Sequence, residues 1–421
     1  RHFHSTISIA DSMGIIASIW NKITYTKALE QSSGKFETIF FESVYRVTYI
    51  GGWSVHDHDI GYRIYSGIIK VTTALLIMSE IWYLFSESHN NLDSIIDNVN
   101  ATLIHLIALY RYRNMIKNKA IYINLSTSME SEYFDSSTKR RKRMVHFWSQ
   151  RNERFLILLL SLGFGALSAW HVYPLVDDVE YNLMVAVRLP FSYETPFRYS
   201  VTYIVTFFVF NYTSLFVMIN DLIMQAHLLH LLCQYTVLAD CFRYIVEDCD
   251  VKENFIANDL FMTKYLERLH GLVEQHKFIL RNTMDLKRSL NAPMLGQFAA
   301  SGMLICGISF QATTTVGISI IKFFMSLLYL MYNMFELFIF CKWCDEIKIQ
   351  SQNIGEAVYS SGWENGISLR PGVRSRLLLV IARAQKPLVL TAGGLFELSL
   401  ESYLVKTSYS ALTVLRRFQT E

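Results

Sequence analysis

Charged residues are scarce in this sequence, and so are proline and glycine. Only 18% of the 421 residues are Asp, Glu, Lys or Arg, against about 25% in soluble proteins, so a series of soluble domains is not expected. Six prolines and 19 glycines are too few for a collagen-like, disordered or loop-rich all-β chain. The net charge of +3 is too small to make nucleic acid the main partner. Hydrophobic residues make up 52% of the chain and gather in long blocks, which indicates a helical membrane protein.

Seven stretches reach the length of about 20 mostly apolar residues that a helix needs to cross a bilayer. They are 64–85, 92–110, 155–176, 199–219, 295–316, 318–340 and 398–415. The second stretch would place Asp97, Asn98, Asn100 and His105 at membrane depth. We expect these to face the bundle interior or a wet cavity. Residues 1–20 lack an uninterrupted apolar core and do not resemble a cleavable signal, so we expect insertion to depend on internal segments.

The distribution of Lys and Arg predicts the orientation of the spans. The segment before residue 64 holds six of them, the loop 111–154 holds eleven, and the loop 177–198 holds only two. Because basic loops stay in the cytoplasm, the N-terminus is predicted to be cytoplasmic and the C-terminus extracellular. This is the reverse of a G-protein-coupled receptor. In this topology none of the six cysteines lies in an extracellular loop, so no disulfide framework is expected.

The connection at 221–292 is predicted to be helical rather than a loop. Apolar residues continue the fourth span at helical spacing; they are Leu222, Ala226, Leu229, Leu232 and Cys233. After a break near Asp250, a second amphipathic helix is marked by Leu266, Leu269, Val273 and Leu280 and leads to Asn291-Ala292-Pro293. Two such rods would project well beyond the bilayer. We interpret them as an assembly platform for neighbouring subunits.

The most distinctive sequence motifs lie near the C-terminus. Ser361-Gly362-Trp363 is followed by a predicted amphipathic helix at 374–385, then by KPLVLTAGG at 386–394, LSLESY at 398–403 and KTSYSALTVLR at 406–416. These runs resemble the C-terminal signature of insect odorant receptors, in particular their odour-tuned subunits. LPF at 189–191, TPF at 195–197 and EAVY at 356–359 support the resemblance.

The resemblance implies an all-α membrane protein with seven transmembrane helices and a cytosolic anchor domain. It further implies the odorant-binding subunit of an odour-gated, non-selective cation channel, which is not an enzyme and needs neither a cofactor nor a G protein. The implied partners are the odorant receptor co-receptor in a heterotetramer, a small volatile organic ligand, membrane lipid and permeant cations, in the plasma membrane of an olfactory sensory neuron. A seven-span carrier, or a receptor of the gustatory type, stays open as the alternative. The spans show no inverted repeat typical of carriers.

We expect six regions along the chain. They are a cytoplasmic segment at 1–63, spans one to four within 64–220, a cytosolic helical extension at 221–292, spans five and six within 293–340, a cytosolic anchor helix and turn at 341–394, and a pore-lining seventh span with an extracellular end at 395–421.

By resemblance, the odour pocket lies between the second, third, fourth and sixth spans. Trp170 follows Ala166 and Gly163 on one helical face, and small residues next to a Trp leave room for a ligand. Tyr329 and Tyr332 also share a face. The predicted ligand-binding residues are Thr102, Gly163, Ala166, Trp170, Phe207, Asn211, Tyr329 and Tyr332. Ordinary aromatic packing between helices is the alternative for each of them.

A pore-lining face is predicted on the seventh span. Glu401, Val405, Ser408, Leu412 and Leu415 recur at spacings of four and three. An apolar ring at Leu412 could gate by dewetting, and the resemblance assigns Ser408, Leu412, Leu415 and Arg416 to the pore and gate. A helix packed on lipid and neighbours, without a pore, is the alternative.

Two further patterns carry no expected chemistry. The side chains of His56-Asp57-His58-Asp59 diverge at this spacing, so a solvated turn is expected. Cys341 and Cys344 form a CxxC without a second pair or a nearby His, so no zinc site is expected.

Overall fold

The computed structural model describes residues 20, 22–86, 92–176, 181–249, 259–315, 320–364, 367 and 371–405. Within these residues the chain is almost wholly helical. The elements are α2 (Lys27–Ser32), α3 (Phe36–Ile50), α4 (Ile60–Ser86), α5 (Leu92–Lys117), α6 (Lys119–Ser126), the 3₁₀ helix η1 (Ser128–Glu130), α7 (Lys139–Val176), α8 (Pro196–Arg243), α9 (Ile245–Asp248), α10 (Asp259–Thr315), α11 (Ile320–Tyr359), α12 (Val373–Ala384), β1 (Thr391–Ala392) and β2 (Phe396–Glu397). The two strands form a short antiparallel ladder. The predicted helical class is confirmed.

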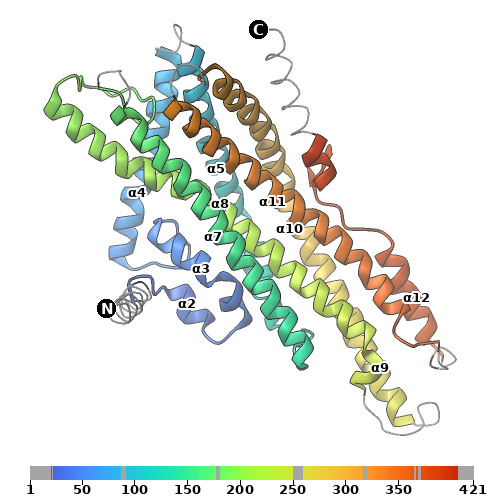
Figure 1. Cartoon of the computed structure of the whole chain (residues 1–421). Coiled ribbons are helices and arrows are strands. Elements are labelled where there is room, and N and C mark those ends of the chain that lie inside the picture. The colour runs from blue at the N-terminus through green and yellow to red at the C-terminus, as the bar shows by residue number, and fades with distance from the viewer. Residues whose placement is uncertain are drawn as a thin grey trace, which may run out of the picture.

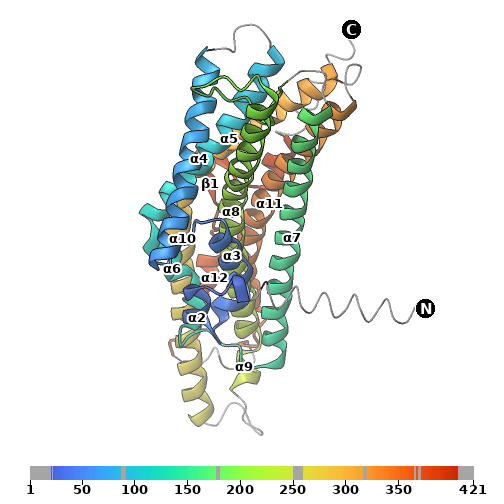
Figure 2. The same cartoon turned by 90° about the vertical axis from the view of Figure 1, so that its left-hand side faces the viewer.

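Five helices are long and apolar enough to cross a membrane. They are Ile60–Ser86, Lys139–Val176, Pro196–Arg243, Leu260–Ser309 and Phe323–Tyr359. These overlap the first, third, fourth, fifth and sixth predicted spans. The second predicted span lies in α5, and most of the seventh lies outside the described residues. The long helices run side by side along the molecule (Figures 1 and 2), as expected of a multi-pass membrane protein.

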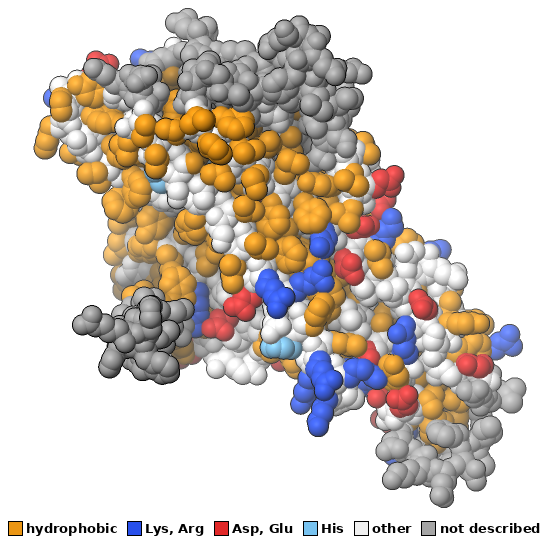
Figure 3. Space-filling model, viewed as in Figure 1, with side chains coloured by type: hydrophobic (Ala, Val, Ile, Leu, Met, Phe, Trp, Pro, Cys, Tyr) orange, Lys and Arg blue, Asp and Glu red, His pale blue; other side chains and the backbone are white. Residues whose placement is uncertain are grey.

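Helix α4 turns its apolar side outward and its polar side inward. Large exposed residues recur every three or four positions; they are Ile60, Ile64, Ile68, Val71, Leu75, Met78, Trp82 and Phe85. Ser66, Thr73 and Glu80 are buried on the opposite face. A soluble helix shows the reverse pattern, so the outward stripe indicates contact with lipid. Figure 3 shows hydrophobic side chains over the upper part of the molecule and charged side chains gathered over the lower part.

Helix α8 forms the centre of the bundle and packs against α7 and α11, among others. From Phe216 to Phe242 most of its side chains are buried. At about 1.5 Å per residue, its 48 residues extend about 70 Å, more than twice the ~30 Å hydrocarbon core of a bilayer. The predicted helical continuation of the fourth span beyond residue 221 is therefore confirmed, as one unbroken helix.

The two ends of the bundle differ. The loop end carries residues 181–195, the end of α4 and the start of α5, whereas the anchor end carries α9, α12 and the adjoining parts of α8, α10 and α11 (Figure 1). Between them, α3 packs against α7 and α8, and the Asn152 side chain donates to the Phe40 carbonyl over 2.9 Å. The helix predicted at 374–385 is confirmed as α12, which packs against α11.

Helix α10 runs through Pro293 without ending there. The sequence predicts a helix that leads to residues 291–293 and a separate span after it, but the structure has one helix from Asp259 to Thr315. Proline cannot donate to the carbonyl four residues earlier, which belongs to Ser289. The Asn114 side chain donates to that carbonyl over 2.8 Å and compensates for the missing bond.

The basic run KRRKR at 139–143 is partly buried at the anchor end. Arg141 is fully buried, and its guanidinium pairs with Asp135, Asp240 and Asp248. Buried charges need such partners, so this cluster holds the start of α7 against the ends of α8 and α9.

Candidate functional site

A cavity of about 60 Å³ lies between α5, α7, α8 and α11, in the half of the bundle nearer the loop end. We call it the loop-side cavity. It is lined by Ala101, Ile104, His105, Gly163, Ala166, Leu167, Trp170, Phe210, Ser214, Val217, Met218, Tyr329 and Tyr332. The structure thus brings together five of the eight predicted ligand-binding residues, namely Gly163, Ala166, Trp170, Tyr329 and Tyr332.

Gly163 lets α7 approach the cavity wall closely. A Cβ atom at this position would lie 2.8 Å from Sδ of Met218, closer still to its methyl group, and 3.4 Å from the Tyr332 ring. The approaches to Met218 are shorter than van der Waals contact, so any larger residue displaces Met218. The volume of the loop-side cavity therefore depends on the missing side chain at position 163.

Aromatic rings frame the loop-side cavity. The Trp170 ring lies 5.7 Å from the Tyr329 ring, at an interplanar angle of 73°. It also lies 5.7 Å from the Phe210 ring, at 32°. Tilted and edge-on ring pairs of this kind stabilise one arrangement of the wall. The surface that they offer a ligand is apolar and polarisable.

The other three predicted ligand-binding residues do not line the loop-side cavity. Thr102 is buried on α5 beside the lining residue Ala101. The Phe207 ring lies 4.4 Å from the His171 ring. The Asn211 side chain lies 2.9 Å from Nε2 of His171 and donates to the Phe207 carbonyl. Phe207 and Asn211 therefore belong to a neighbouring cluster around His171.

The polar face of the second predicted span turns inward, as its residues require. Nδ1 of His105 lies 3.0 Å from Oε2 of Glu80, and both side chains are almost fully buried. Asn98 donates to the carbonyls of Glu80 and Ala186. Asp97 has no described side chain. Because His105 also lines the loop-side cavity, this cluster contributes a polar group to its wall.

Tyr332 connects the loop-side cavity to a buried cluster of charges. Its hydroxyl donates to Oδ2 of Asp221 over 3.2 Å. Arg111 lies 2.6 Å from the other oxygen of Asp221 and 3.3 Å from Glu336. Gln297 donates to Glu336 over 2.8 Å. We call Arg111, Asp221, Gln297, Tyr332 and Glu336 the Arg111 cluster. All five side chains are buried.

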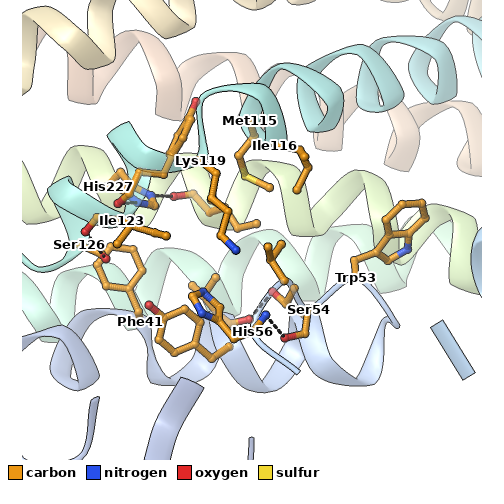
Figure 4. A pocket seen from close by; sticks show the side chains of 16 residues that line it. Phe41, Trp53, Ser54, His56, Met115, Ile116, Lys119, Ile123, Ser126 and His227 are labelled. Carbon is orange, nitrogen blue, oxygen red and sulfur yellow. Dashed lines mark hydrogen bonds between the residues drawn. The ribbon is translucent and has the colours of Figure 1, made fainter. Parts of the chain in front are cut away.

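A second cavity of about 90 Å³ lies between α3, residues 53–56, the junction of α5 and α6, and α8 (Figure 4). We call it the anchor-side cavity. It is lined by Phe41, Val44, Tyr45, Thr48, Trp53, Ser54, Val55, His56, Met115, Ile116, Lys119, Tyr122, Ile123, Ser126, Ile223 and His227. The sequence offers no sign of it, because its walls come from four separate segments.

The turn at residues 56–59 is only partly solvated, contrary to the expectation. Asp57 is buried and accepts hydrogen bonds from the Lys27 backbone N–H over 2.9 Å and from the Ser54 hydroxyl over 2.6 Å. It therefore fixes the segment that leads into α4. Within the described residues, no group of three or more His, Cys, Asp or Glu could hold a metal ion. Cys341 and Cys344 are buried and unbridged.

The predicted pore residues Ser408, Leu412, Leu415 and Arg416 lie outside the described residues. The start of their span is described, and it flanks a groove along α10. That groove is lined by Leu295, Phe298, Ala299, Gly302, Met303, Cys306, Phe396, Glu401, Ser402 and Val405. Val405 is exposed. The predicted pore face therefore begins beside α10.

Long helices with lipid-facing apolar stripes that enclose a small aromatic cavity are those of a multi-pass membrane protein. Residues 91–409 match the model of the 7tm odorant receptor family, and the chain belongs to this family of non-enzymatic sensory receptors. It is 24% identical over 362 residues to odorant receptor 10 of Aedes albopictus, covering 84% of this chain and 91% of that protein. It is also 24% identical over 332 residues to odorant receptor 13a of Drosophila melanogaster, covering 75% of each.

The fold is shared with a solved receptor. The insect olfactory receptor OR5 from Machilis hrabei superposes with a TM-score of 0.76 at 17% identity, covering 91% of this chain and 98% of that one. The structure of the same receptor in complex with eugenol gives a TM-score of 0.75 at 17% identity, over 91% and 100% of the two chains.

Proposed function

We propose that this chain is the odorant-binding subunit of an odour-gated, non-selective cation channel, and that the loop-side cavity binds the odorant. The observation that supports the proposal is the meeting of Trp170, Tyr329 and Tyr332 around one cavity in the membrane-crossing part of the bundle. A receptor of the same fold has been solved with eugenol, a small aromatic molecule. Membership of the odorant receptor family gives the ligand class.

The walls of the loop-side cavity suit a small and mostly apolar ligand. Ser214 can offer one hydrogen bond, since its hydroxyl has no partner within the described part of the chain, and His105 can offer another. The cavity is smaller than the roughly 150 Å³ that accepts benzene in an engineered apolar cavity, so an odorant has to widen it. Met218 is the natural part of the wall to move, because an unbranched thioether changes rotamer easily. We expect weak, shape-tolerant binding.

Widening of the loop-side cavity can reach the rest of the molecule through Tyr332. An odorant that displaces this ring also disturbs the bond to Asp221, and with it the contacts of Arg111. Binding opens the channel only to the extent that the odorant prefers the open arrangement. In this proposal the last span lines the pore, with Ser408, Leu412, Leu415 and Arg416 at the pore and gate.

The remaining parts of the proposal concern assembly and orientation. The chain assembles with the odorant receptor co-receptor in the plasma membrane of olfactory sensory neurons, and the helices at the anchor end contact neighbouring subunits. In this proposal the anchor end and the N-terminus lie in the cytoplasm, as the distribution of Lys and Arg predicts. The six predicted regions, from 1–63 to 395–421, follow from this orientation.

Co-expression with the co-receptor tests the proposal. Odorant should evoke a cation current in excised patches without nucleotide, and Leu412→Ala should change conduction or resting leak for every agonist. Trp170→Ala should change the ranking of odorants instead, while surface expression and currents evoked by a co-receptor agonist stay unchanged. Uptake without current, or a requirement for a G protein, would contradict the proposal.

A further inference from the structure

The anchor-side cavity lies at a membrane boundary. Its lining residues come from before the first predicted span (64–85), after the second (92–110) and after the fourth (199–219). These three positions are on the same side of the predicted bilayer, the side of the anchor end. The cavity is therefore at the depth where lipid headgroups meet the hydrocarbon core, and Trp53 in its wall is a residue type that concentrates at this depth.

The floor of the anchor-side cavity is apolar and buried, whereas its mouth is open to the surroundings. Phe41, Val44 and Trp53 are 1%, 2% and 4% exposed. Ile116 and Ile123, at the mouth, are 40% and 38% exposed. A molecule that enters from the boundary would place an apolar body against the floor and leave its other end at the mouth.

Lys119 supplies a positive charge at the mouth. Figure 4 shows its side chain reaching from the junction of α5 and α6 into the pocket, toward the segment that carries Ser54 and His56. Within the described part of the chain, the Lys119 ammonium group makes no hydrogen bond and no ion pair. Burial and the charge of Lys119 lower the pKa of His56 below its ordinary value, so at pH 7 this ring is a neutral hydrogen-bonding group.

The acidic groups near the anchor-side cavity are occupied by other partners. Glu37 accepts hydrogen bonds from the hydroxyls of Tyr45 and Ser126. Asp57 accepts from the Lys27 backbone and from Ser54. Neither carboxylate forms an ion pair with Lys119, so its ammonium group is available to an anion that enters the mouth.

We propose that the anchor-side cavity binds a single-chain carboxylate of the fatty-acid type, with its carboxylate on Lys119 and its chain running toward Trp53. A free fatty acid reaches this depth from the bilayer itself. A cavity of about 90 Å³ admits part of one chain, whereas a phospholipid brings two. The site is separate from the loop-side cavity, so a negative result here would not contradict the proposed odorant site.

Fluorescence quenching by 8-bromooctanoate tests the site in the full-length chain, purified in lipid nanodiscs. Bromine quenches tryptophan only at near-contact, so saturable quenching is expected in the wild type and its loss in Trp53→Phe. Lys119→Gln should weaken binding about tenfold, the effect of a lost charged hydrogen bond. Lys117→Gln, a nearby exposed lysine that does not line the cavity, should bind like the wild type. Equal affinity in Lys119→Gln, or equal quenching in Trp53→Phe, would overturn the proposal.

Two further comparisons determine which class of ligand binds. The neutral analogue 8-bromooctanol should bind as weakly as 8-bromooctanoate binds to Lys119→Gln, and equal binding of acid and alcohol to the wild type would contradict the carboxylate. Unlabelled octanoate should displace the probe and dihexanoyl phosphatidic acid should not; the reverse would assign the site to phospholipid. If Trp53→Phe does not fold, a diazirine fatty acid should label residues 41–56 or 115–126, and labelling confined to other segments would overturn the site.

Discussion

The hydroxyl of Tyr332 lies 3.2 Å from Oδ2 of Asp221, so a wall of the loop-side cavity and a buried carboxylate share one side chain. The ring faces the cavity and the hydroxyl faces Arg111 and its partners. Substitutions can therefore separate the two roles of this residue.

Tyr332→Phe keeps the ring and removes the hydroxyl. We expect the ranking of odorants to stay the same, while the response to all of them shifts by about tenfold or more, the effect of one hydrogen bond to a charged group. Dose–response curves for a panel of odorants, with the co-receptor present, measure both quantities. The control is Tyr329→Phe, whose ring also lines the cavity but which does not contact Asp221. A changed ranking in Tyr332→Phe would show that the hydroxyl binds odorant directly.

Gly163→Ala should shrink the loop-side cavity, because the added methyl group meets Met218 and Tyr332. The Met218 side chain that it displaces should fill part of the cavity, so large odorants should lose potency while small ones lose less. A series of homologous odorants of increasing length, tested on the co-expressed channel, measures the effect.

The double variant Gly163→Ala with Met218→Ala should restore the potency of the larger odorants, because the shortened side chain at position 218 makes room for the added methyl group. Gly165→Ala is the matched control, because a Cβ at Gly165 meets nothing within 4 Å. Equal losses in the variants at positions 163 and 165 would place odorant binding elsewhere.

Arg111→Met should prevent normal folding. It leaves Asp221 and Glu336 buried without their cation, a defect that costs about 3–5 kcal/mol. Surface biotinylation and the thermal stability of the purified chain measure the loss. Arg113→Gln, an exposed position on the same helix, should be harmless. The triple variant Arg111→Met, Asp221→Leu, Glu336→Met should regain part of the stability, because an apolar replacement removes the unpaired charges; no recovery would mean that the cluster does more than pair charges.

The anchor end should lose stability in mild acid. Burial, with a smaller contribution from Arg383, lowers the pKa of His276 to about 4, whereas an unfolded histidine titrates near 6.5. The unfolded chain therefore binds the proton first, so stability is full above about pH 6.5 and falls between about pH 6.5 and 4. The total loss from this one residue is about 3 kcal/mol.

Melting temperatures of the purified chain between pH 7.5 and pH 5 check this expectation. His276→Gln should flatten the dependence on pH, and His270→Gln, which replaces an exposed histidine on the same helix, should not. A slope that is unchanged in His276→Gln would assign the acid sensitivity to other groups, such as the buried His230, whose pKa is lowered to about 3 by burial and by His227.

Features that repeat along one helix could be predicted from the sequence, and features made between helices could not. Gly163, Ala166 and Trp170 share a helical face, as do Tyr329 and Tyr332, and these spacings identify five lining residues. Helix α8 is apolar both on its exposed face, which carries Ile204 and Phe208, and on its inner face, so no amphipathic stripe shows which face meets the cavity. Phe210, rather than Phe207 or Asn211, is the residue that faces it.

The sequence did not indicate which residues, far apart along the chain, pair with each other in the fold. His105 was recognisable as a polar residue at membrane depth, but nothing identified Glu80 as its partner. Arg111 stood among loop residues, where an arginine is ordinary, although it is buried against Asp221 and Glu336. The anchor-side cavity needs the packing of α3 against α8, and no pattern within either helix encodes that contact.

The pairing of Arg111 with Glu336 also constrains how the chain is made. The two residues are 225 positions apart, so at about 5–20 residues per second the ribosome takes roughly 10–45 s to deliver the glutamate after the arginine. During that interval the nascent chain holds a cation at the membrane boundary without its full set of counter-charges. A stable subunit can therefore form in the endoplasmic reticulum only after α11 has been completed. Any chain truncated before residue 336 should be retained and degraded.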